Sequence, residues 1–390
     1  MKRIGVLLAS EPGGGTFQYT HAVLEAVQAL PQSDYTLIAA LFSSDWLEYL
    51  REDVAIVRLD HTRWNRGLNK AWHLSHLPIS VWRLSAARLD SNVRTLLAAK
   101  ADLWVCPNQD RYSFRAPVPA LGTVHDLMHR YEPRFPEVSL NGEYESREFH
   151  FRETCRWSKG VLVDSEAGKR QLVESYGISP EKVFALPYIA PSYIHDPATV
   201  TDREVARRYS LPYKYFFYPA QFFKHKNHAM LVSSIARLRR THPDVRLVLA
   251  GAQQRNGYAD VRRMVDELGV AENVSFIGYV PDAHMPALYR GARALVMPTF
   301  FGPTNIPQLE AFALGCPVAT SRIYGIPEQV GDAALLFDPS SAEQIHGALL
   351  RLWTDDELCA DLARRGTARS HKWGAPEFAT RFREIVDALT

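Results

Sequence analysis

The sequence has little cysteine, no long apolar run and no excess of charge of one sign. Its 390 residues include only four cysteines, which lie far apart and form no CxxC motif or Cys/His cluster. This favours buried thiols in a reducing compartment over disulfides or a zinc site, so no metal site is expected. Lys and Arg number 45 against 43 Asp and Glu. The net charge of +2 is far from the excess of a nucleic-acid binder, so no nucleic-acid partner is expected.

Segments that would take the chain into or across a membrane are also missing. No stretch of about 18 apolar residues is present, which excludes a spanning helix. The apolar run after Lys2 and Arg3 has about six residues, too few for a signal peptide, and we interpret it as a first β-strand. We therefore expect a cytoplasmic protein.

Short apolar segments that alternate with helical patterns are what the sequence has in abundance. Near-continuous apolarity in short segments is typical of parallel strands that are covered on both faces. Strands are predicted at residues 3–9, 35–42, 54–59, 103–106, 118–124, 160–164, 182–186, 214–219, 245–250, 274–277, 294–297 and 317–320. Helices are predicted at 16–30, 228–240, 260–268, 341–353, 356–369 and 375–389.

The chain is too long for a single core, because cores seldom grow beyond roughly 250–300 residues. A proline-rich stretch without periodicity follows Leu186 and indicates a linker. We predict an α/β protein with two doubly wound, Rossmann-like domains that face each other across a cleft, the usual place for a ligand. The expected division is an N-terminal domain (1–195), a linker (196–213), a C-terminal domain (214–372) and a final helix (373–390).

Two motifs of the N-terminal half lie at predicted strand ends. Gly13, Gly14 and Gly15 separate the first strand from a helix, where glycines allow a ligand to approach and free N–H groups attract anions. A tight turn explains the same residues. His125 and Asp126 end another strand; the imidazole can bind a sugar hydroxyl or carry a proton, or it can be a satisfied structural histidine, and Asp126 can be a cap.

Two further motifs lie in the C-terminal half. Lys224-His225-Lys226-Asn227 opens a helix, and cations beside a helix N-terminus suit a diphosphate, although an exposed basic turn is equally compatible. In FGPTNIPQLEAFALGCPV (301–318), a loop leads into a helix that starts near Ile306. The N–H groups of Thr304, Asn305 and Ile306 are expected to face a ligand, with the Glu310 carboxylate about one turn further on, where it can accept from two adjacent hydroxyls.

With these motifs, the second half resembles the nucleotide-sugar-binding domain of retaining glycosyltransferase family 4, of the two-Rossmann-domain (GT-B) type. The matching pieces are YPAQFFKHKNHAMLV (218–232), VRLVLAG (245–251), NVSFIGYVPDAHMPALYRGARALVMPT (273–299), residues 301–318 and PEQVGDAALLFDP (327–339). Together they cover most of 214–340. The first half is similar through GGGTFQY, TVHD and VLVDS.

The resemblance implies roles for individual residues. Lys226 takes the position of a lysine on the donor diphosphate, and Glu310 that of the carboxylate on the ribose hydroxyls. His125 is placed near the transferred sugar, and Gly14 and Gly15 near the donor phosphates. The resemblance also implies that the N-terminal domain (1–195) binds the acceptor and the C-terminal domain (214–372) the nucleotide sugar. In such enzymes the final helix crosses back, so Trp373 onward is expected on the N-terminal half.

Two positions depart from the family pattern. The first glutamate of its paired motif is Gly302 here, and an arginine that often precedes the lysine is Gln221. Loss of that arginine removes a charged hydrogen bond to the diphosphate, worth roughly 1.5–3 kcal/mol. Loss of the glutamate indicates either a subgroup that binds the sugar through backbone N–H groups or an inactive relative. The intact flanking sequence favours the first.

The resemblance implies retaining transfer of a hexosyl unit from a nucleotide diphosphate sugar to a glycan or lipid-linked glycan acceptor. Mannose is favoured on resemblance alone; rhamnose or another hexose stays open. No separate cofactor and no metal is expected, since the nucleotide sugar is itself the donor substrate. The alternatives are a nucleotide-sugar 2-epimerase-like enzyme and an inactive nucleotide-binding scaffold.

Residues 58–100 are basic and rich in tryptophan. They hold eight Lys and Arg against two Asp, a local charge of +6, with Trp64, Trp72 and Trp82 among them. This composition is typical of a membrane-interface segment, which would bring the protein to the inner face of the membrane. A solvated helical face with its tryptophans in the core explains it equally well.

Overall fold

The computed structural model describes residues 1–10, 13–75, 77–253 and 256–390. The chain forms two compact units. Unit 1 comprises Met1–Leu127, Glu145–Pro187 and Ala375–Thr390, and unit 2 comprises Met128–Tyr144 and Tyr188–Gly374. The chain therefore passes between the units several times, so each unit is built from segments far apart in the sequence.

Unit 1 contains a sheet of seven strands in the order β3-β2-β1-β4-β5-β6-β7. All neighbouring strands are parallel. The strands are β1 (Lys2–Leu8), β2 (Tyr35–Leu41), β3 (Ala55–Arg58), β4 (Leu103–Val105), β5 (Ala120–Thr123), β6 (Gly160–Val163) and β7 (Val183–Ala185). Consecutive residues of β4, β5 and β6 are buried, which requires that both faces of the sheet are covered.

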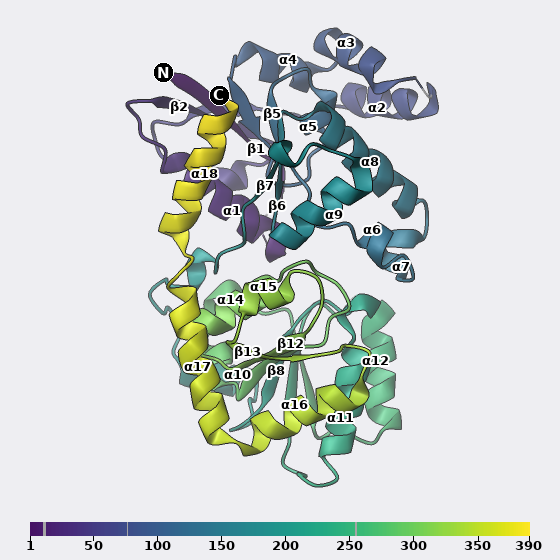
Figure 1. The fold of residues 1–390 in the computed structure, drawn as a ribbon, viewed down its shortest axis with the longest axis vertical. Coiled ribbons are helices and arrows are strands. Elements are labelled where there is room, and N and C mark those ends of the chain that lie inside the picture. Colours follow the sequence, from purple (N-terminus) through teal and green to yellow (C-terminus); the bar gives the residue numbers. More distant parts are fainter. Residues whose placement is uncertain (11–12, 76, 254–255) are drawn as a thin grey trace. The chain divides into compact units, whose positions relative to one another are not determined.

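Helices provide that cover (Figure 1). The helices of unit 1 are α1 (Gly14–Gln28), η1 (Ser44–Tyr49), α2 (Arg63–Ser75), α3 (Ile79–Leu89), α4 (Ser91–Ala98), α5 (Tyr112–Arg115), α8 (Glu143–Trp157, which begins in unit 2), α9 (Glu166–Tyr176), η2 (Pro180–Lys182) and α18 (Ala375–Leu389). Trp72 and Trp82 pack against each other in the core beneath α2 and α3, with ring centroids 5.5 Å apart.

Unit 2 contains a sheet of six parallel strands in the order β10-β9-β8-β11-β12-β13. The strands are β8 (Phe216–Pro219), β9 (Leu247–Ala250), β10 (Val274–Gly278), β11 (Ala294–Met297), β12 (Val318–Ser321) and β13 (Ala334–Phe337). The order reverses between β8 and β11, as it does between β1 and β4 in unit 1. Such reversal points at the carboxyl ends of parallel strands are where doubly wound sheets bind ligands.

Most helices of unit 2 pack against one continuous core, and the first two, α6 (Met128–Tyr131) and α7 (Pro136–Ser139), pack against a smaller apolar cluster. The others are η3 (Ser192–Ile194), α10 (Asp202–Arg208), η4 (Lys224–Lys226), α11 (His228–Leu238), α12 (Asn256–Glu267), η5 (Asp282–His284), α13 (Met285–Gly291), α14 (Ile306–Ala313), α15 (Ile326–Val330), α16 (Ala342–Thr354) and α17 (Asp356–Ser370). Throughout the described parts of both units, no helix is long and apolar enough to cross a membrane.

The predicted α/β class with two doubly wound, Rossmann-like domains is confirmed. Each of the twelve predicted strands overlaps a strand of the structure, and each predicted helix overlaps an observed one. The sequence prediction missed β13, a four-residue strand at the edge of the second sheet. The four cysteines are buried and unpaired, as expected.

The division of the chain differs from the expected one at two places. Residues 128–144 belong to unit 2, although they interrupt the sequence of unit 1. Unit 2 then resumes at Tyr188, and the expected linker 196–213 contains α10, whose Val205 lies in the core and whose Asp202 forms an ion pair with Arg290. Proline content identified an irregular stretch but not the packing that assigns it to a unit.

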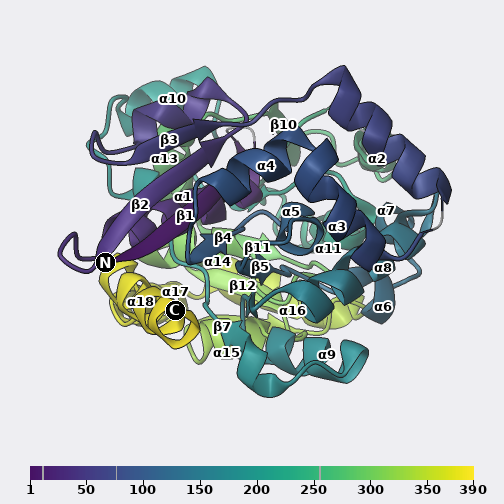
Figure 2. The same ribbon diagram turned by 90° about the horizontal axis from the view of Figure 1, so that it is seen from above.

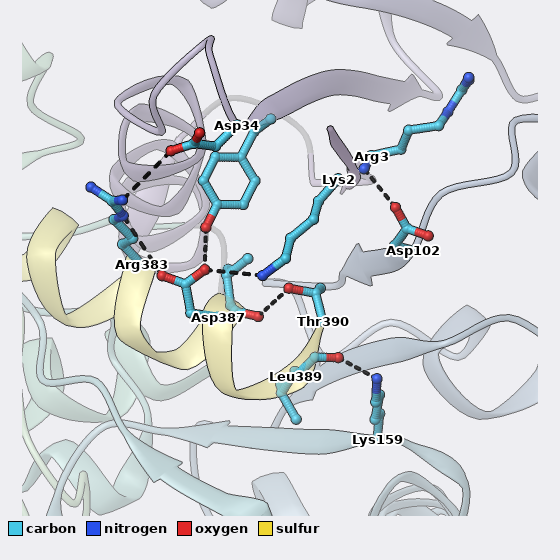
Figure 3. A network of polar contacts seen from close by, with 11 residues as sticks. Lys2, Arg3, Asp34, Asp102, Lys159, Arg383, Asp387, Leu389 and Thr390 are labelled. Carbon is cyan, nitrogen blue, oxygen red and sulfur yellow. Dashed lines mark hydrogen bonds and ion pairs between the residues drawn. The ribbon is translucent and has the colours of Figure 1, made fainter.

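The last helix, α18, belongs to unit 1, where it packs against α1 (Figure 2). Its apolar side, which includes Phe378 and Phe382, is buried. Polar contacts tie it to the strands: Asp387 accepts from Tyr35 and pairs with Lys2 at 3.2 Å, and the Lys159 ammonium donates to the carbonyl of Leu389 (Figure 3). The two ends of the chain are therefore neighbours within one unit.

Candidate active site

In unit 2, the loop that carries Lys226 is fixed at the carboxyl ends of the strands. It follows β8, and Asn227 ends it in the left-handed conformation at φ 59°. The buried Asn227 amide donates to the carbonyls of Pro298 (2.9 Å) and Pro339 (2.8 Å), which follow β11 and β13. The Lys226 carbonyl accepts from Tyr218 of β8 at 2.9 Å. Three strand ends therefore hold the backbone of this loop.

The same loop is bonded to the segment that precedes α14. The His225 carbonyl accepts from the N–H of Phe300 at 2.7 Å and from the Thr299 hydroxyl at 3.2 Å. The predicted diphosphate lysine and the predicted sugar-binding loop are thus brought together. Gln221, at the position of the family's arginine, is partly buried, and its Oε1 has no hydrogen-bond partner among the described residues.

Glu137 of α7 is a contributor that the sequence did not reveal. Its carboxylate accepts from the backbone N–H of Lys224 and of His225 (3.4 Å), and lies 3.4 Å from His225 Nδ1. Burial alone would raise the pKa of Glu137, but the hydrogen bonds and charge of His225 dominate and lower it to about 2. Phe135 and Val138 place it by packing against Phe301. No local pattern near Glu137 points to this contact.

Glu310 lies in α14 and is buried among tyrosines. One carboxylate oxygen accepts from Tyr193 at 2.5 Å and the other from Tyr289. Burial raises the pKa of Glu310, and the two tyrosine hydrogen bonds offset part of that increase. The resemblance implies that Glu310 accepts hydrogen bonds from two ribose hydroxyls. In the structure, two tyrosine hydroxyls donate to it instead. A ligand hydroxyl would have to share these oxygens through their second lone pairs.

The loop before α14 is held in a conformation that only glycine adopts easily. Gly302 has φ 132°, and a Cβ there would lie 2.8 Å from the Asn305 amide. The Gln329 side chain clamps Asn305 by accepting from its N–H (3.0 Å) and donating to its carbonyl (2.8 Å). The Asn305 N–H, which was expected to face a ligand, therefore already has a protein partner. Thr304 is buried in the same loop, and Ile306 starts α14 as predicted.

In unit 1, the glycine motif opens α1. Gly13 (φ 119°) and Gly14 (φ 75°) have backbone angles that other residues rarely adopt, while a Cβ on Gly14 would meet nothing within 4 Å. Conformation and not crowding is thus the reason for glycine here. Gly15 is exposed in the first turn of the helix.

His125 follows β5 and is packed edge-on against Tyr19, with ring centroids 5.1 Å apart. The backbone N–H of His125 donates to Gln109 Oε1 at 2.9 Å. Burial lowers the pKa of its imidazole to about 4, so the ring is neutral at pH 7. It can therefore exchange hydrogen bonds with a hydroxyl but does not supply a positive charge. The adjacent Asp126 forms an ion pair with Arg147.

The predicted residues thus form two sets. Gln221, Lys226, the 304–306 loop and Glu310 lie in unit 2, and Gly14, Gly15 and His125 lie in unit 1. The described residues contain no group of three or more His, Cys, Asp or Glu side chains that could hold a metal. The tyrosine partners of Glu310 and the clamp by Gln329 had no recognisable signal in the sequence.

Comparisons with known proteins bear on both units. The model of the family "Glycosyl transferases group 1" matches residues 203–369. The O-antigen chain mannosyltransferase B of Escherichia coli is 26% identical over 297 residues, which are 71% of this chain and 74% of that protein. A D-inositol 3-phosphate glycosyltransferase of Corynebacterium aurimucosum is 26% identical over 288 residues, 70% of this chain and 67% of that protein.

Among solved structures, Anabaena HepE in complex with UDP and glucose has a TM-score of 0.75 at 16% identity and covers 100% of both chains. At this identity the likeness concerns the fold alone. The chain thus has the two-domain GT-B fold, and its residues 203–369 are similar to the glycosyl transferases of group 1.

Proposed function

We propose that the protein is a retaining glycosyltransferase that moves a hexosyl unit, with mannosyl favoured, from a nucleotide diphosphate sugar to a glycan or lipid-linked glycan. The observation that carries this proposal is the hydrogen-bonded junction of the Lys226 loop with the loop before α14, at the reversal point of the second sheet. A cation and a helix N-terminus at one sheet edge form an anion site. The name of the E. coli relative supports the mannosyl choice.

In the proposed reaction, the bond between the anomeric carbon and the diphosphate oxygen breaks first. Lys226 and the N-terminus of α14 stabilise the negative charge that develops on the leaving diphosphate. The acceptor hydroxyl attacks from the same face, and its proton passes to the leaving oxygen, so that the products are a retained glycoside and a nucleoside diphosphate. Neutral His125 binds a hydroxyl of the transferred sugar, and Gly14 and Gly15 leave room for donor phosphates.

We further propose that this reaction needs no metal and no other cofactor, because the protein itself supplies the positive charge on the diphosphate. Glu310 orients the site through Tyr193 and Tyr289 and shares its oxygens with the ribose hydroxyls. The expected test result is that chelation by EDTA leaves the transfer rate unchanged.

Transfer and its stereochemistry test the proposal directly. The protein would be incubated with GDP-mannose, UDP-glucose and dTDP-rhamnose together with lipid-linked or soluble glycan acceptors, and the products examined by NMR. One donor should give a glycoside of unchanged anomeric configuration. Conversion of the donor without an acceptor would indicate epimerase chemistry, and binding without turnover on any acceptor would indicate a scaffold.

We also propose that α2 and α3 contact the inner face of a membrane. Trp72 and Trp82 are core residues, so only Trp64, which is 63% exposed, retains the expected interfacial role. The stripe Leu77, Val81 and Leu84 is nevertheless exposed, with Leu84 at 78%. Exposed basic residues accompany it at positions 63, 66, 70 and 88, while residue 76 lies outside the described residues.

Vesicle sedimentation tests this contact. Anionic phosphatidylglycerol vesicles should bind the protein more than neutral phosphatidylcholine vesicles do, and Leu84→Ser should reduce binding. Leu140→Ser changes an exposed leucine of unit 2 and serves as the matched control. Equal binding to both vesicles, or equal effects of both variants, would refute the contact.

A further inference from the structure

Unit 1 contains a pocket of about 520 Å³ at the carboxyl edge of its sheet. Residues that follow four strands line it: Ala9 after β1, Phe42 after β2, His61 after β3 and Asn108 after β4. The pocket thus includes the reversal point between β1 and β4, where a doubly wound sheet binds its ligand. Its volume is in the range of small-molecule sites.

The pocket is connected to His125 through Gln109. Gln109 lines the pocket in the left-handed conformation, at φ 47°, and its Oε1 accepts the His125 N–H. A non-glycine residue in this conformation is uncommon and is maintained only by its surroundings. The pocket is therefore built beside the histidine proposed to bind a sugar hydroxyl.

Two of the lining side chains have a buried polar atom that lacks a protein partner. Asp110 Oδ2 and His150 Nε2 have no hydrogen-bond partner among the described residues. A buried polar atom of this kind destabilises the fold, because its lost hydrogen bonds to water are not replaced, and a ligand that supplies a partner removes this cost. A carboxylate oxygen that accepts and an imidazole nitrogen that accepts or donates are suited to the hydroxyls of a sugar.

One wall of the pocket is aromatic. The rings of Phe42 and His61 are stacked, with centroids 4.5 Å apart and planes 12° apart. The ring centroid of Tyr112 lies 6.0 Å from that of Phe42. Flat apolar surfaces of this kind pack against the C–H face of a pyranose ring, while its hydroxyls point to the polar side.

The pocket also concentrates positive charge. Arg111 is exposed, while Arg115 is buried with its guanidinium 4.8 Å from the Trp82 ring. Burial, and then the charge of Arg111, lowers the pKa of Arg115 to about 10. Burial and the charges of Arg111 and Arg147 likewise lower the pKa of His150 to about 3. Asp110 is the single carboxylate among the described lining residues, so an anionic group on the ligand is attracted.

We propose that this pocket binds the acceptor through a sugar that carries an anionic group, a phosphate or a carboxylate. Asp110 and His150 bind ring hydroxyls, the Phe42–His61 stack supports the ring face, and Arg111 with Arg115 attracts the anion. The inference rests on the proposed function, which it deepens by naming the acceptor class.

Calorimetric titration of the full chain tests it with mannose 6-phosphate, glucuronate and methyl α-mannoside. The two anionic probes distinguish a phosphate from a carboxylate. At least one should bind tenfold or more tightly than the methyl glycoside, and Arg111→Met should weaken it at least tenfold, or about 1.4 kcal/mol. Arg170→Met removes an exposed arginine of α9 and should change nothing.

Asp110→Asn separates the hydroxyl contacts from the charge contacts. It should weaken charged and uncharged sugars by the same factor and leave nucleotide binding intact. The proposal is overturned if no probe binds, if the methyl glycoside binds as tightly as both anions, or if Arg111→Met has no effect. If the protein transfers sugar but is insensitive to Arg111→Met, this inference fails while the proposed function stands. If anionic sugars bind and no transfer occurs, the proposed function fails while the binding of anionic sugars by this pocket stands.

Discussion

Both units have a parallel sheet with a reversal point, but the polar groups near the two reversal points differ in their hydrogen bonding. In unit 2, Glu310 is bonded to two tyrosines, Asn227 to two carbonyls and Glu137 to a backbone turn, although Glu137 Oε2 and Gln221 Oε1 lack a partner among the described residues. In unit 1, Asp110 and His150 line a pocket and keep polar atoms without partners among the described residues. Hydrogen bonds within the protein hold Glu310 and Asn227, whereas we propose that a ligand provides the missing partners of Asp110 and His150.

The pKa values of two carboxyl groups, Glu137 in unit 2 and Asp110 in unit 1, are shifted in opposite directions. The interactions of Glu137 with His225 lower its pKa to about 2, despite its burial. Burial raises the pKa of Asp110 to about 7, and its hydrogen bond from the Tyr112 backbone and the charge of Arg111 offset only part of that increase. A carboxylate whose pKa is lowered in the folded state stabilises the fold, whereas one whose pKa is raised destabilises it as it ionises.

Removal of Glu310 should have the largest effect. Glu310→Ala leaves the hydroxyls of Tyr193 and Tyr289 buried without their acceptor and should lower the free energy of unfolding by about 2–4 kcal/mol. Urea denaturation measures this. Glu357→Ala, at an exposed position of α17, is the control. Equal stability of the two variants would show that the tyrosine contacts contribute nothing.

Reinstating the family's carboxylate should also destabilise the protein. Gly302→Glu places a side chain where φ is 132° and Asn305 lies 2.8 Å from the new Cβ, which should lower the free energy of unfolding by about 1–3 kcal/mol. Gly302→Ala separates backbone strain from the effect of the carboxylate. If Gly302→Glu were as stable as the natural chain and bound nucleotide more tightly, the account of this loop would be wrong.

Glu137→Gln should lose stability in a pH-dependent manner. Because its pKa is depressed to about 2 in the folded state, Glu137 stabilises above its ordinary pKa of 4.5, and this contribution disappears as the pH falls towards 2. The variant should be less stable by about 1–2 kcal/mol at pH 6, and the difference should shrink at pH 3. Glu143→Gln, at an exposed position, should show no such trend.

Asp110→Asn should show the opposite sign in unit 1. Because the folded-state pKa of Asp110 is raised from 3.8 to about 7, its ionisation destabilises the fold as the pH rises through that range. Relative to the natural chain, the free energy of unfolding of the variant should rise by about 3 kcal/mol between pH 4 and pH 7, because each unit of pKa shift corresponds to about 1.4 kcal/mol. Burial, together with the charge of Asp110, raises the pKa of Cys106 and of Tyr112 above this range, so both stay neutral and the pH dependence of the difference reports Asp110. A difference that does not vary with pH would refute the assignment.

The sequence predicted the sheets well because their signal is local. Buried parallel strands are short apolar runs, and twelve were placed correctly. The strand β13 was missed although it is apolar and as long as strands such as β12 that were predicted; unlike β12, it is only partly buried at three of its four positions. The start of α14 at Ile306 was predicted because proline in a first helical turn is a local signal.

The partners at the sites were not predictable because they come from distant parts of the chain. Glu310 meets Tyr193, which is 117 positions away, and the Lys226 loop meets Glu137 across 87 positions or more. The pocket of unit 1 joins loops after four strands to His150 of α8. Only the packing of helices on the sheets brings such residues together, and a single sequence contains no record of it.

Calorimetric binding of GDP, UDP, dTDP and ADP to the full chain tests the central claim most directly. One nucleotide should bind, and Lys226→Met should weaken it at least tenfold, about 1.4 kcal/mol, without a change in unfolding. Lys372→Met, which removes an exposed lysine of unit 2, should leave the affinity unchanged. Binding of no nucleotide, or equal affinity of both variants and the natural chain, would contradict a donor site at Lys226.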